Sequence, residues 1–203
     1  MQAAQTLAAL LVVLACAACT ERGATLPKLA RDDVILAFGD SLTAGVGAAE
    51  HESYPAVLGG LIGHDVVRSG VPGELTAQAL QRLPEAIEEH RPKLVIVCIG
   101  GNDMLRRLSL SDARANVRAM LKTLEDRDIA AVLIGVPQPA LLSSPPAFYA
   151  ELAAEFAIPY EGEILKTVLF TADLKADPVH PNAGGYRRIA EALAVLLRKS
   201  GAL

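Results

Sequence analysis

The amino-acid sequence predicts an α/β fold in which a parallel sheet carries helices on both faces. From Asp33 onward, short apolar runs alternate with longer amphipathic segments. The short runs are bounded by turn residues, which is typical of buried parallel strands. In the longer segments, apolar residues recur at helical spacing. A chain of 203 residues without an internal repeat or a low-complexity linker fits one domain, which we expect at residues 33–203.

The expected elements follow these patterns along the chain. The expected strands are residues 34–38, 65–68, 94–99, 131–134 and a weaker fifth at 158–160. The expected helices are residues 54–61, 75–90, 112–127, 147–156 and 183–198. In the second helix, an apolar stripe at four-residue spacing is formed by Leu75, Ala79, Leu83 and Ile87. Pro84 interrupts this helix and should kink or split it. Ser111-Asp112 and Asn182 are the expected N-caps of the third and fifth helices.

The N-terminal segment is typical of a bacterial secretory signal. The apolar stretch of residues 6–18 ends in small residues and is too short for a comfortable transmembrane helix. Residues 1–5 lack the basic side chains that usually precede such a stretch. Cys16 and Cys19 each end a sequence that resembles a lipobox, so residues 1–19 are interpreted as a lipoprotein signal and residues 20–32 as a short tether. The alternative is cleavage after Ala17 or Ala18, which would leave a soluble periplasmic protein. In both cases we expect the protein to be located in the bacterial cell envelope.

Composition excludes several classes of function. The net charge is -4 and Lys and Arg do not cluster, so the chain lacks the basic patch that nucleic-acid binding requires. Three cysteines that are not grouped with histidines make neither a disulfide framework nor a zinc site. Cys98 lies within an apolar run and is interpreted as a small core residue. We therefore expect neither a metal nor a cofactor.

The residue types of a serine hydrolase occur at the expected strand ends. Ser41 follows the first strand, and chemistry collects at the carboxyl ends of strands in open α/β sheets. Asp177 and His180 lie three residues apart, just before the last helix. A serine becomes a nucleophile when an imidazole accepts its proton and a carboxylate orients that imidazole. The sequence therefore predicts Ser41, His180 and Asp177 as a catalytic triad. The second glycine of the G-x-S-x-G elbow is missing after Ser41.

Three hydrogen-bond donors are candidates for an oxyanion hole, which acyl transfer also requires. They are the backbone N–H of Ser41, the backbone N–H of Gly73 after the second strand, and the side-chain amide of Asn102 after the third. Gly70 is a rival for the position of Gly73. Asp40 and Asp103 are expected to bond to turn backbone and so to hold Ser41 and Asn102 in place.

The sequence resembles the GDSL, or SGNH, hydrolases, and is most similar to the bacterial periplasmic thioesterase I, lysophospholipase and arylesterase group. The resemblance spans about residues 33–198 and rests on four blocks in order: Gly39-Asp40-Ser41-Leu42, the Gly73 turn, Gly101-Asn102-Asp103 and Asp177-x-x-His180-Pro181. It implies a three-layer α/β/α, flavodoxin-like fold with a parallel sheet of about five strands. It also implies Ser41 as nucleophile, His180 as general base and acid, Asp177 as orienter, and Ser41, Gly73 and Asn102 as the oxyanion hole.

These observations favour a monomeric serine esterase or thioesterase that hydrolyses aryl or short-chain esters, lysophospholipids or acyl thioesters. The expected substrate pocket consists of Leu105, Leu108, Leu141, Leu142 and Val179. Because these side chains are apolar, the pocket favours a substrate with an acyl chain. The proline-rich stretch 137–146 is a candidate wall of this pocket. Two alternatives stay open: a carbohydrate O-acetylesterase with the same triad, and a non-catalytic envelope protein that uses the fold for binding.

Overall fold

The protein is built around a parallel β-sheet. The computed structural model describes residues 24–138 and 144–203. In this part of the chain the sheet has five strands: β1 (Ile35–Gly39), β2 (Val66–Gly70), β3 (Leu94–Cys98), β4 (Ala130–Ile134) and β5 (Tyr160–Glu161). Their order is β2-β1-β3-β4-β5 and every pairing is parallel. This is the flavodoxin-like order, in which the chain reverses direction across the sheet between β1 and β3. The predicted α/β/α fold is confirmed.

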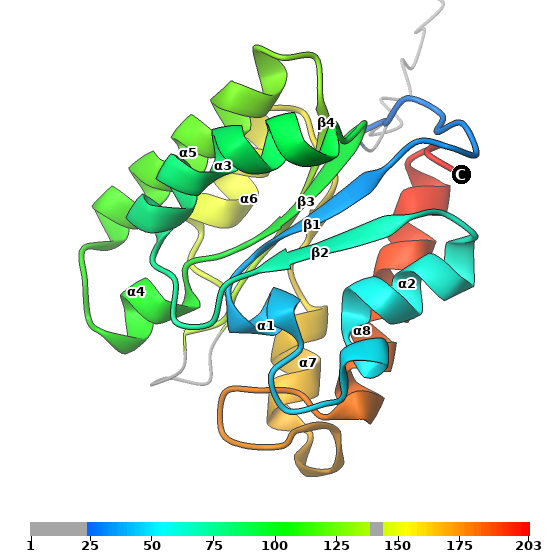
Figure 1. Cartoon of the computed structure of the whole chain (residues 1–203). Coiled ribbons are helices and arrows are strands. Elements are labelled where there is room, and N and C mark those ends of the chain that lie inside the picture. Colours follow the sequence, from blue (N-terminus) through cyan, green and yellow to red (C-terminus); the bar gives the residue numbers. More distant parts are fainter. Residues whose placement is uncertain (1–23, 139–143) are drawn as a thin grey trace, which may run out of the picture.

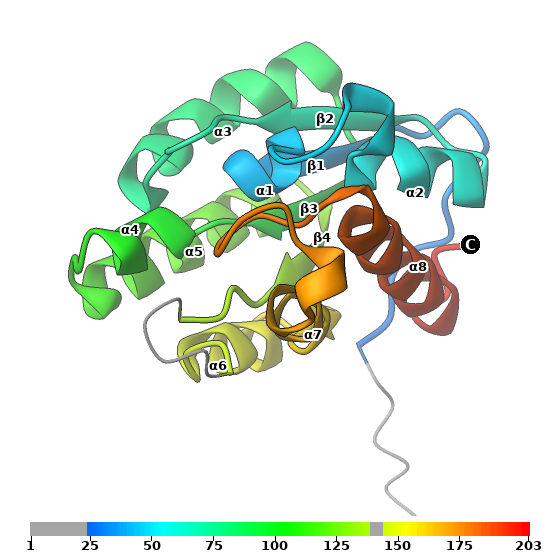
Figure 2. The same cartoon turned by 90° about the horizontal axis from the view of Figure 1, so that it is seen from below.

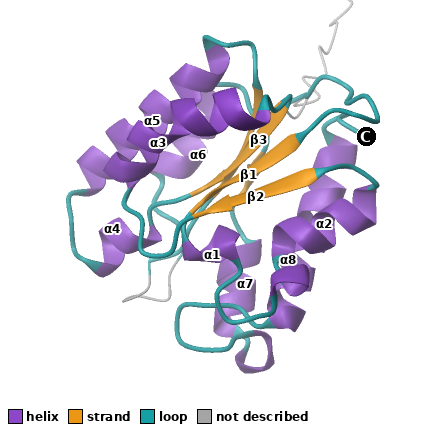
Figure 3. Ribbon diagram, viewed as in Figure 1, coloured by secondary structure: helices purple, strands orange, loops and turns teal. Residues whose placement is uncertain are grey.

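Helices cover both faces of the sheet (Figure 1). On one side lie α3 (Thr76–His90), α5 (Leu110–Glu125) and α6 (Phe148–Glu155). On the other lie α2 (Tyr54–Ile62) and α8 (Ala183–Lys199), which pack against each other. This distribution follows from right-handed crossovers, because the step from β1 to β2 and the later steps run in opposite directions along the sheet. The central strands β1 and β3 are buried along their whole length between the two layers (Figure 3).

The long helices form where the apolar pattern predicts them, with adjusted ends. In α3 the side chains of Ala79, Leu83 and Ile87 are buried, as the stripe requires. The helix continues through Pro84, so it is not split there. The apolar stripe packs on both sides of Pro84 and offsets the one backbone hydrogen bond that the proline lacks. Helix α5 begins earlier than expected because its N-cap is Ser109, whose hydroxyl accepts from the N–H of Asp112.

Short helices surround the carboxyl ends of the strands (Figure 2). They are α1 (Ser41–Ala44), α4 (Gly101–Leu105), α7 (Ile164–Phe170) and the 3-10 turns η1 (Glu50–Glu52) and η2 (Ala172–Leu174). The sequence pattern did not predict them, because an element of one or two turns is too short to display a periodicity. They nevertheless shape the edge of the sheet at which Ser41 lies.

The two ends of the described chain lie together. The N–H of Leu26 donates to the carbonyl of Ser200, and that of Leu29 donates to the carbonyl of Ala202, both at 2.8 Å. The side chain of Leu29 is buried in the core. The packed part of the chain therefore begins within the expected tether, ahead of the boundary at Asp33. Cys16, Cys19 and the expected signal lie outside the described residues. In residues 24–138 and 144–203, no helix combines the length and apolar character needed to cross a membrane.

Candidate active site

Ser41, His180 and Asp177 form a continuous chain of hydrogen bonds. The Oγ of Ser41 lies 3.0 Å from Nε2 of His180, although 139 residues separate them in the sequence. The Nδ1 of His180 lies 2.7 Å from Oδ2 of Asp177. In the neutral tautomer with its proton on Nδ1, the imidazole donates to Asp177 and accepts from Ser41. A hydroxyl, an imidazole and a carboxylate joined in this order can pass the hydroxyl proton to the imidazole.

The turn before α8 holds the acid and the imidazole together. The other carboxylate oxygen of Asp177 accepts from the backbone N–H groups of Val179 and His180 at 2.8 and 2.9 Å. Partial burial raises the pKa of Asp177, but the hydrogen bond from His180 and the two backbone donors outweigh this and hold it below its usual value. Asn182 then caps α8, as predicted, by accepting from the N–H of Gly185. The carboxylate is thus ionised and fixed beside the ring.

Ser41 begins α1 directly after β1, the central strand of the β2-β1-β3 group. Asp40 is the N-cap of α1, and its Oδ1 accepts from the N–H of Leu42 at 3.0 Å. The Asp40 side chain is only 1% exposed. The pKa of Asp40 is raised to about 7, mainly by burial and to a smaller extent by the nearby carboxylates of Glu74 and Asp103, while the hydrogen bond from the Leu42 N–H lowers it. Asp40 therefore fixes the turn that presents Ser41, as expected from its position.

Gly73, rather than its rival Gly70, faces the site. Gly73 has a backbone φ of 79°, a left-handed conformation that residues other than glycine rarely adopt. It lines the cavity next to Ser41. Within the described residues, no group accepts a hydrogen bond from the Gly73 N–H. Gly70 ends β2 and packs so closely against α1 that a Cβ there would collide with the backbone of Asp40 and Ala44. Of the two glycines, Gly73 alone lines the cavity.

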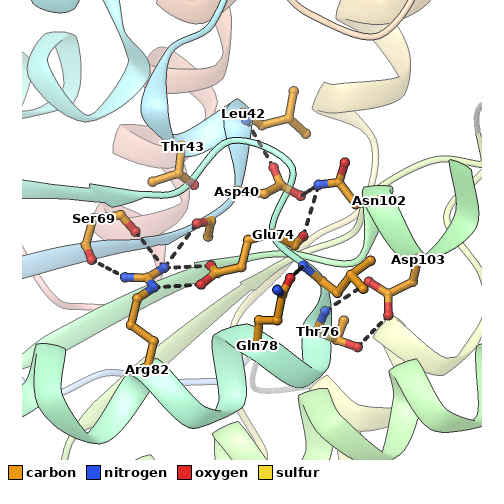
Figure 4. A network of polar contacts seen from close by, with 12 residues as sticks. Asp40, Leu42, Thr43, Ser69, Glu74, Thr76, Gln78, Arg82, Asn102 and Asp103 are labelled. Atoms are coloured by element: carbon orange, nitrogen blue, oxygen red, sulfur yellow. Dashed lines mark hydrogen bonds and ion pairs between the residues drawn. The ribbon is translucent and has the colours of Figure 1, made fainter. Parts of the chain in front are cut away.

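Asn102 lies on α4 at the carboxyl end of β3 and also lines the cavity. Its side-chain nitrogen donates to the carbonyl of Glu74 at 3.0 Å and to Oδ2 of Asp40 at 3.3 Å (Figure 4). Sequence reasoning did not anticipate either bond. Asp103 was expected to bond to turn backbone, but its partner is the first residue of a helix. It accepts from the N–H and the hydroxyl of Thr76, at the start of α3.

A cavity of about 270 Å³ opens beside Ser41 and His180. Its walls are mostly apolar, and of the expected pocket residues Leu105 and Val179 line it. Leu108 does not, because it lies beyond the end of α4 with 45% of its surface exposed. Leu141 and Leu142 lie outside the described residues. Pro137 and Gln138, the start of the proline-rich stretch expected as a pocket wall, also line the cavity. The sequence analysis missed several lining residues from other elements, which are Val46, Pro72, Val136, Leu169, Phe170 and Pro178.

Comparison with known proteins identifies the family. Residues 37–188 match the model of the GDSL-like Lipase/Acylhydrolase family. The chain is 28% identical over 179 residues to thioesterase 1/protease 1/lysophospholipase L1 of Escherichia coli (strain K12), covering 84% of this chain and 86% of that protein. The crystal structure of TesA matches with a TM-score of 0.72 and 25% identity, over 82% of this chain and 98% of that one.

A second solved structure agrees with this assignment. AlinE4, described as an SGNH-hydrolase family esterase, is 34% identical with a TM-score of 0.64, over 85% of this chain and 98% of that chain. The segment matched by the family model contains Ser41, Gly73, Asn102, Asp177 and His180. The resemblance stated from the sequence is thereby confirmed. The chain belongs to the GDSL-like lipase/acylhydrolase family, and it is an ester hydrolase.

Proposed function

We propose that Ser41, His180 and Asp177 are the catalytic triad of a serine esterase that forms an acyl-enzyme on Ser41. One observation carries this proposal: the chain of hydrogen bonds from Ser41 through His180 to Asp177 at the wall of an apolar cavity. In the first step the Oγ of Ser41 attacks the ester carbonyl while Nε2 of His180 takes its proton. The imidazolium then protonates the leaving alcohol, and a water molecule releases the acid by the reverse sequence.

The oxyanion of each tetrahedral intermediate is proposed to bind to the N–H groups of Ser41 and Gly73 and to the amide of Asn102. Gly73 lines the cavity, and its N–H has no hydrogen-bond acceptor among the described residues, which supports this role. Asn102 already donates twice, so one of its N–H groups must be released or shared when the oxyanion forms. The bond to Asp40 is the longer of the two and would be the one given up. These donors act where negative charge develops, which is the largest single contribution in many acyl-transfer enzymes.

The proposed substrate is an ester with an apolar acyl chain. The cavity is lined by apolar side chains from two parts of the chain. The first part supplies Val46, Leu105 and Val136, and the C-terminal part supplies Leu169, Phe170 and Val179. Such a surface gains free energy by removing methylene groups from water, at about 0.8 kcal/mol for each. An acetyl group would cover little of this apolar surface, and a carbohydrate as the alcohol portion would find few polar partners there, so an O-acetylated carbohydrate is the less favoured substrate. Thioesters and lysophospholipids are further candidates, since the E. coli relative is named for both activities.

A series of p-nitrophenyl esters from acetate to palmitate tests the proposal. We expect hydrolysis that rises with chain length beyond acetate, and Ser41→Ala should abolish it while the protein remains folded. Ser111→Ala, which changes an exposed serine outside the cavity, should keep the wild-type rate. Activity in Ser41→Ala at the wild-type rate would refute the triad. If every p-nitrophenyl ester were inert, acyl-CoA and lysophospholipid would be assayed with the same pair of proteins.

We also propose that the protein is attached to the bacterial envelope through a lipid on Cys16 or Cys19. The apolar stretch of residues 6–18 and the two lipobox-like sequences support this location. Expression in a bacterial host with radiolabelled palmitate should label the wild type and leave the Cys16→Ala, Cys19→Ala double variant unlabelled. An unlabelled wild type would argue for cleavage after Ala17 or Ala18 and a soluble periplasmic protein.

A further inference from the structure

The loop between β2 and α3 carries Gly73 and is fastened by an ion pair that the mechanism above does not use. Glu74 follows Gly73 directly, and its side chain is 5% exposed. Its carboxylate pairs with the guanidinium of Arg82, in the second turn of α3, through two parallel bonds of 2.7 Å. Bidentate pairs of this kind fix orientation as well as distance. The peptide unit of Gly73 and Glu74 is therefore held by the side chain of the second residue.

Arg82 also holds the ends of the two neighbouring strands. Its Nη1 donates to the hydroxyl of Ser69 on β2 at 2.7 Å, and its Nη2 lies 3.3 Å from the carbonyl of Gly39, the last residue of β1. The guanidinium lies over the ring of Phe38, 4.1 Å from its centroid. Figure 4 shows the guanidinium between Ser69 on one side and Glu74 on the other. Ser41 follows Gly39 by two residues, so one planar group connects the strand end that presents Ser41 with the loop that presents Gly73.

The same loop is tied to the other proposed oxyanion donor. The carbonyl of Glu74 accepts from the side-chain amide of Asn102 at 3.0 Å. A shift of Glu74 would thus move the Gly73 N–H and remove a partner of Asn102 together. Partly buried ion pairs add little net stability compared with apolar side chains, because desolvation offsets their attraction. We therefore expect the Glu74–Arg82 pair to fix the position of the loop more than it stabilises the fold.

We propose that Glu74 and Arg82 are positioning residues that set the Gly73 N–H and the Asn102 amide relative to Ser41; this rests on the proposed function of those three residues. Neither side chain lines the cavity, so both act through the loop. A displacement of about 1 Å in a catalytic group can lower the rate by about 10²-fold. The pair should therefore affect the chemical step more than the binding of substrate.

The test uses Glu74→Ala, Arg82→Ala, their double variant and Arg82→Lys. Each protein is treated with a p-nitrophenyl phosphonate, and the nitrophenol released at completion counts the sites that still carry a reactive Ser41. We expect kcat per titrated site to fall about 10- to 100-fold in both single variants with KM changed less than threefold. The double variant should lose no more than either single one, since the two residues act as a unit. Arg82→Lys keeps the charge but not the two parallel bonds, and should also lose activity.

Leu83→Ala is the matched control, because Leu83 is the next residue on α3 and is fully buried in the core. It should lower the melting temperature while kcat per titrated site stays at the wild-type value. The proposal is overturned if the Glu74 and Arg82 variants also keep wild-type kcat per titrated site, or if only KM or the number of titrated sites falls. If Arg82→Ala does not fold, Arg82→Lys decides the matter by the same criteria. A wild type without Ser41-dependent hydrolysis would instead refute the proposed function, and this inference with it.

Discussion

At the scale of single residues, Asn102 is the side chain whose environment departs most from expectation. Its amide reaches the cavity while it donates to Glu74 and Asp40. These bonds hold the amide plane at the cavity wall, and one of them must be released or shared if the amide is to bind an oxyanion. The same bonds also compete with the oxyanion for the two N–H groups. If Asn102 acts as the proposed oxyanion donor, the longer bond to Asp40 is the one available for exchange.

Replacing Asn102 by Ala should lower kcat by roughly 10²- to 10³-fold, because one proposed oxyanion donor is lost. KM should change little, since the donor acts mainly in the transition state. Steady-state hydrolysis of a p-nitrophenyl ester measures both quantities. Asn116→Ala is a suitable control, because Asn116 also uses its amide to bind a neighbour, Thr76, but lies outside the cavity. Equal kcat in Asn102→Ala and wild type would assign the oxyanion to other donors.

Most of the candidate site could be predicted from residue types, their places along the chain and the resemblance to the GDSL hydrolases. Ser41, Asp177 and His180 are recognisable because a nucleophile, a base and an orienting acid have few substitutes, and their positions relative to expected elements limit the choice. The double donation by Asn102 could not be predicted. Its partners lie 28 and 62 residues away, so they depend on how closely three loops approach one another. How closely these loops approach one another depends on the packing of the whole fold, which a local sequence pattern does not predict.

At the scale of secondary structure, the loops and short helices decide the shape of the site. The strands and long helices were predictable, because each displays a period over several residues. Helix α7 was missed, although its Leu169 and Phe170 line the cavity. It has only seven residues, and its sequence is apolar on nearly every side, so it carries no readable stripe. Phe170 is 45% exposed despite its size, a feature that only the folded chain reveals.

Contacts between elements also satisfy a helix end for which the sequence predicted no cap. Asp103 of α4 binds the N–H and the hydroxyl of Thr76, so a residue from another helix satisfies the N-terminus of α3. The side chain of Asn116 on α5 donates to the same hydroxyl at 3.0 Å. Three helices thus meet at one polar point beside the Gly73 loop. Local sequence signals describe caps within a segment and are silent about caps supplied from elsewhere.

At the scale of the whole molecule, the buried carboxyl of Asp40 links stability to pH. Its pKa is about 7 in the folded protein, against 3.8 as the ordinary value. Between these values the folded state binds the extra proton, so the free energy of unfolding should fall as pH rises from about 4 to about 7. The full difference is of the order of 4 kcal/mol at most. The lowered pKa of Asp177 acts the other way, and stability from that group is lost as pH falls below about 4.

Asp40→Asn removes this ionisation and should flatten the decline of the unfolding free energy between about pH 4 and pH 7. Urea denaturation at several pH values, with wild type and variant in parallel, measures the slopes. Asp32→Asn, at an exposed position far from Asp40 in the fold, serves as the control and should keep the wild-type slope. Parallel curves for wild type and Asp40→Asn would show that Asp40 titrates alike in both the folded and the unfolded chain.

The global topology was predictable for a different reason from the site. Alternation of strands and helices implies a parallel sheet, and right-handed crossovers leave few ways to order its strands. The short β5, with two residues, was the weakest expected strand and is the shortest observed in the described part of the chain. The packing of Leu26 and Leu29 against the C-terminal residues could not be predicted, since it pairs two segments that carry no regular pattern.

The adjacency of the two chain ends has a practical consequence. Leu26 and Leu29 meet Ser200 and Ala202 near the amino ends of the strands, whereas Ser41 lies at the carboxyl end of β1 (Figure 1). A support coupled to either end of the described chain would thus face the back of the molecule. The cavity would point toward the surrounding liquid. Immobilisation on a resin, or fusion to a carrier protein, should therefore leave the entrance unobstructed when the attachment is made at either end of residues 24–203.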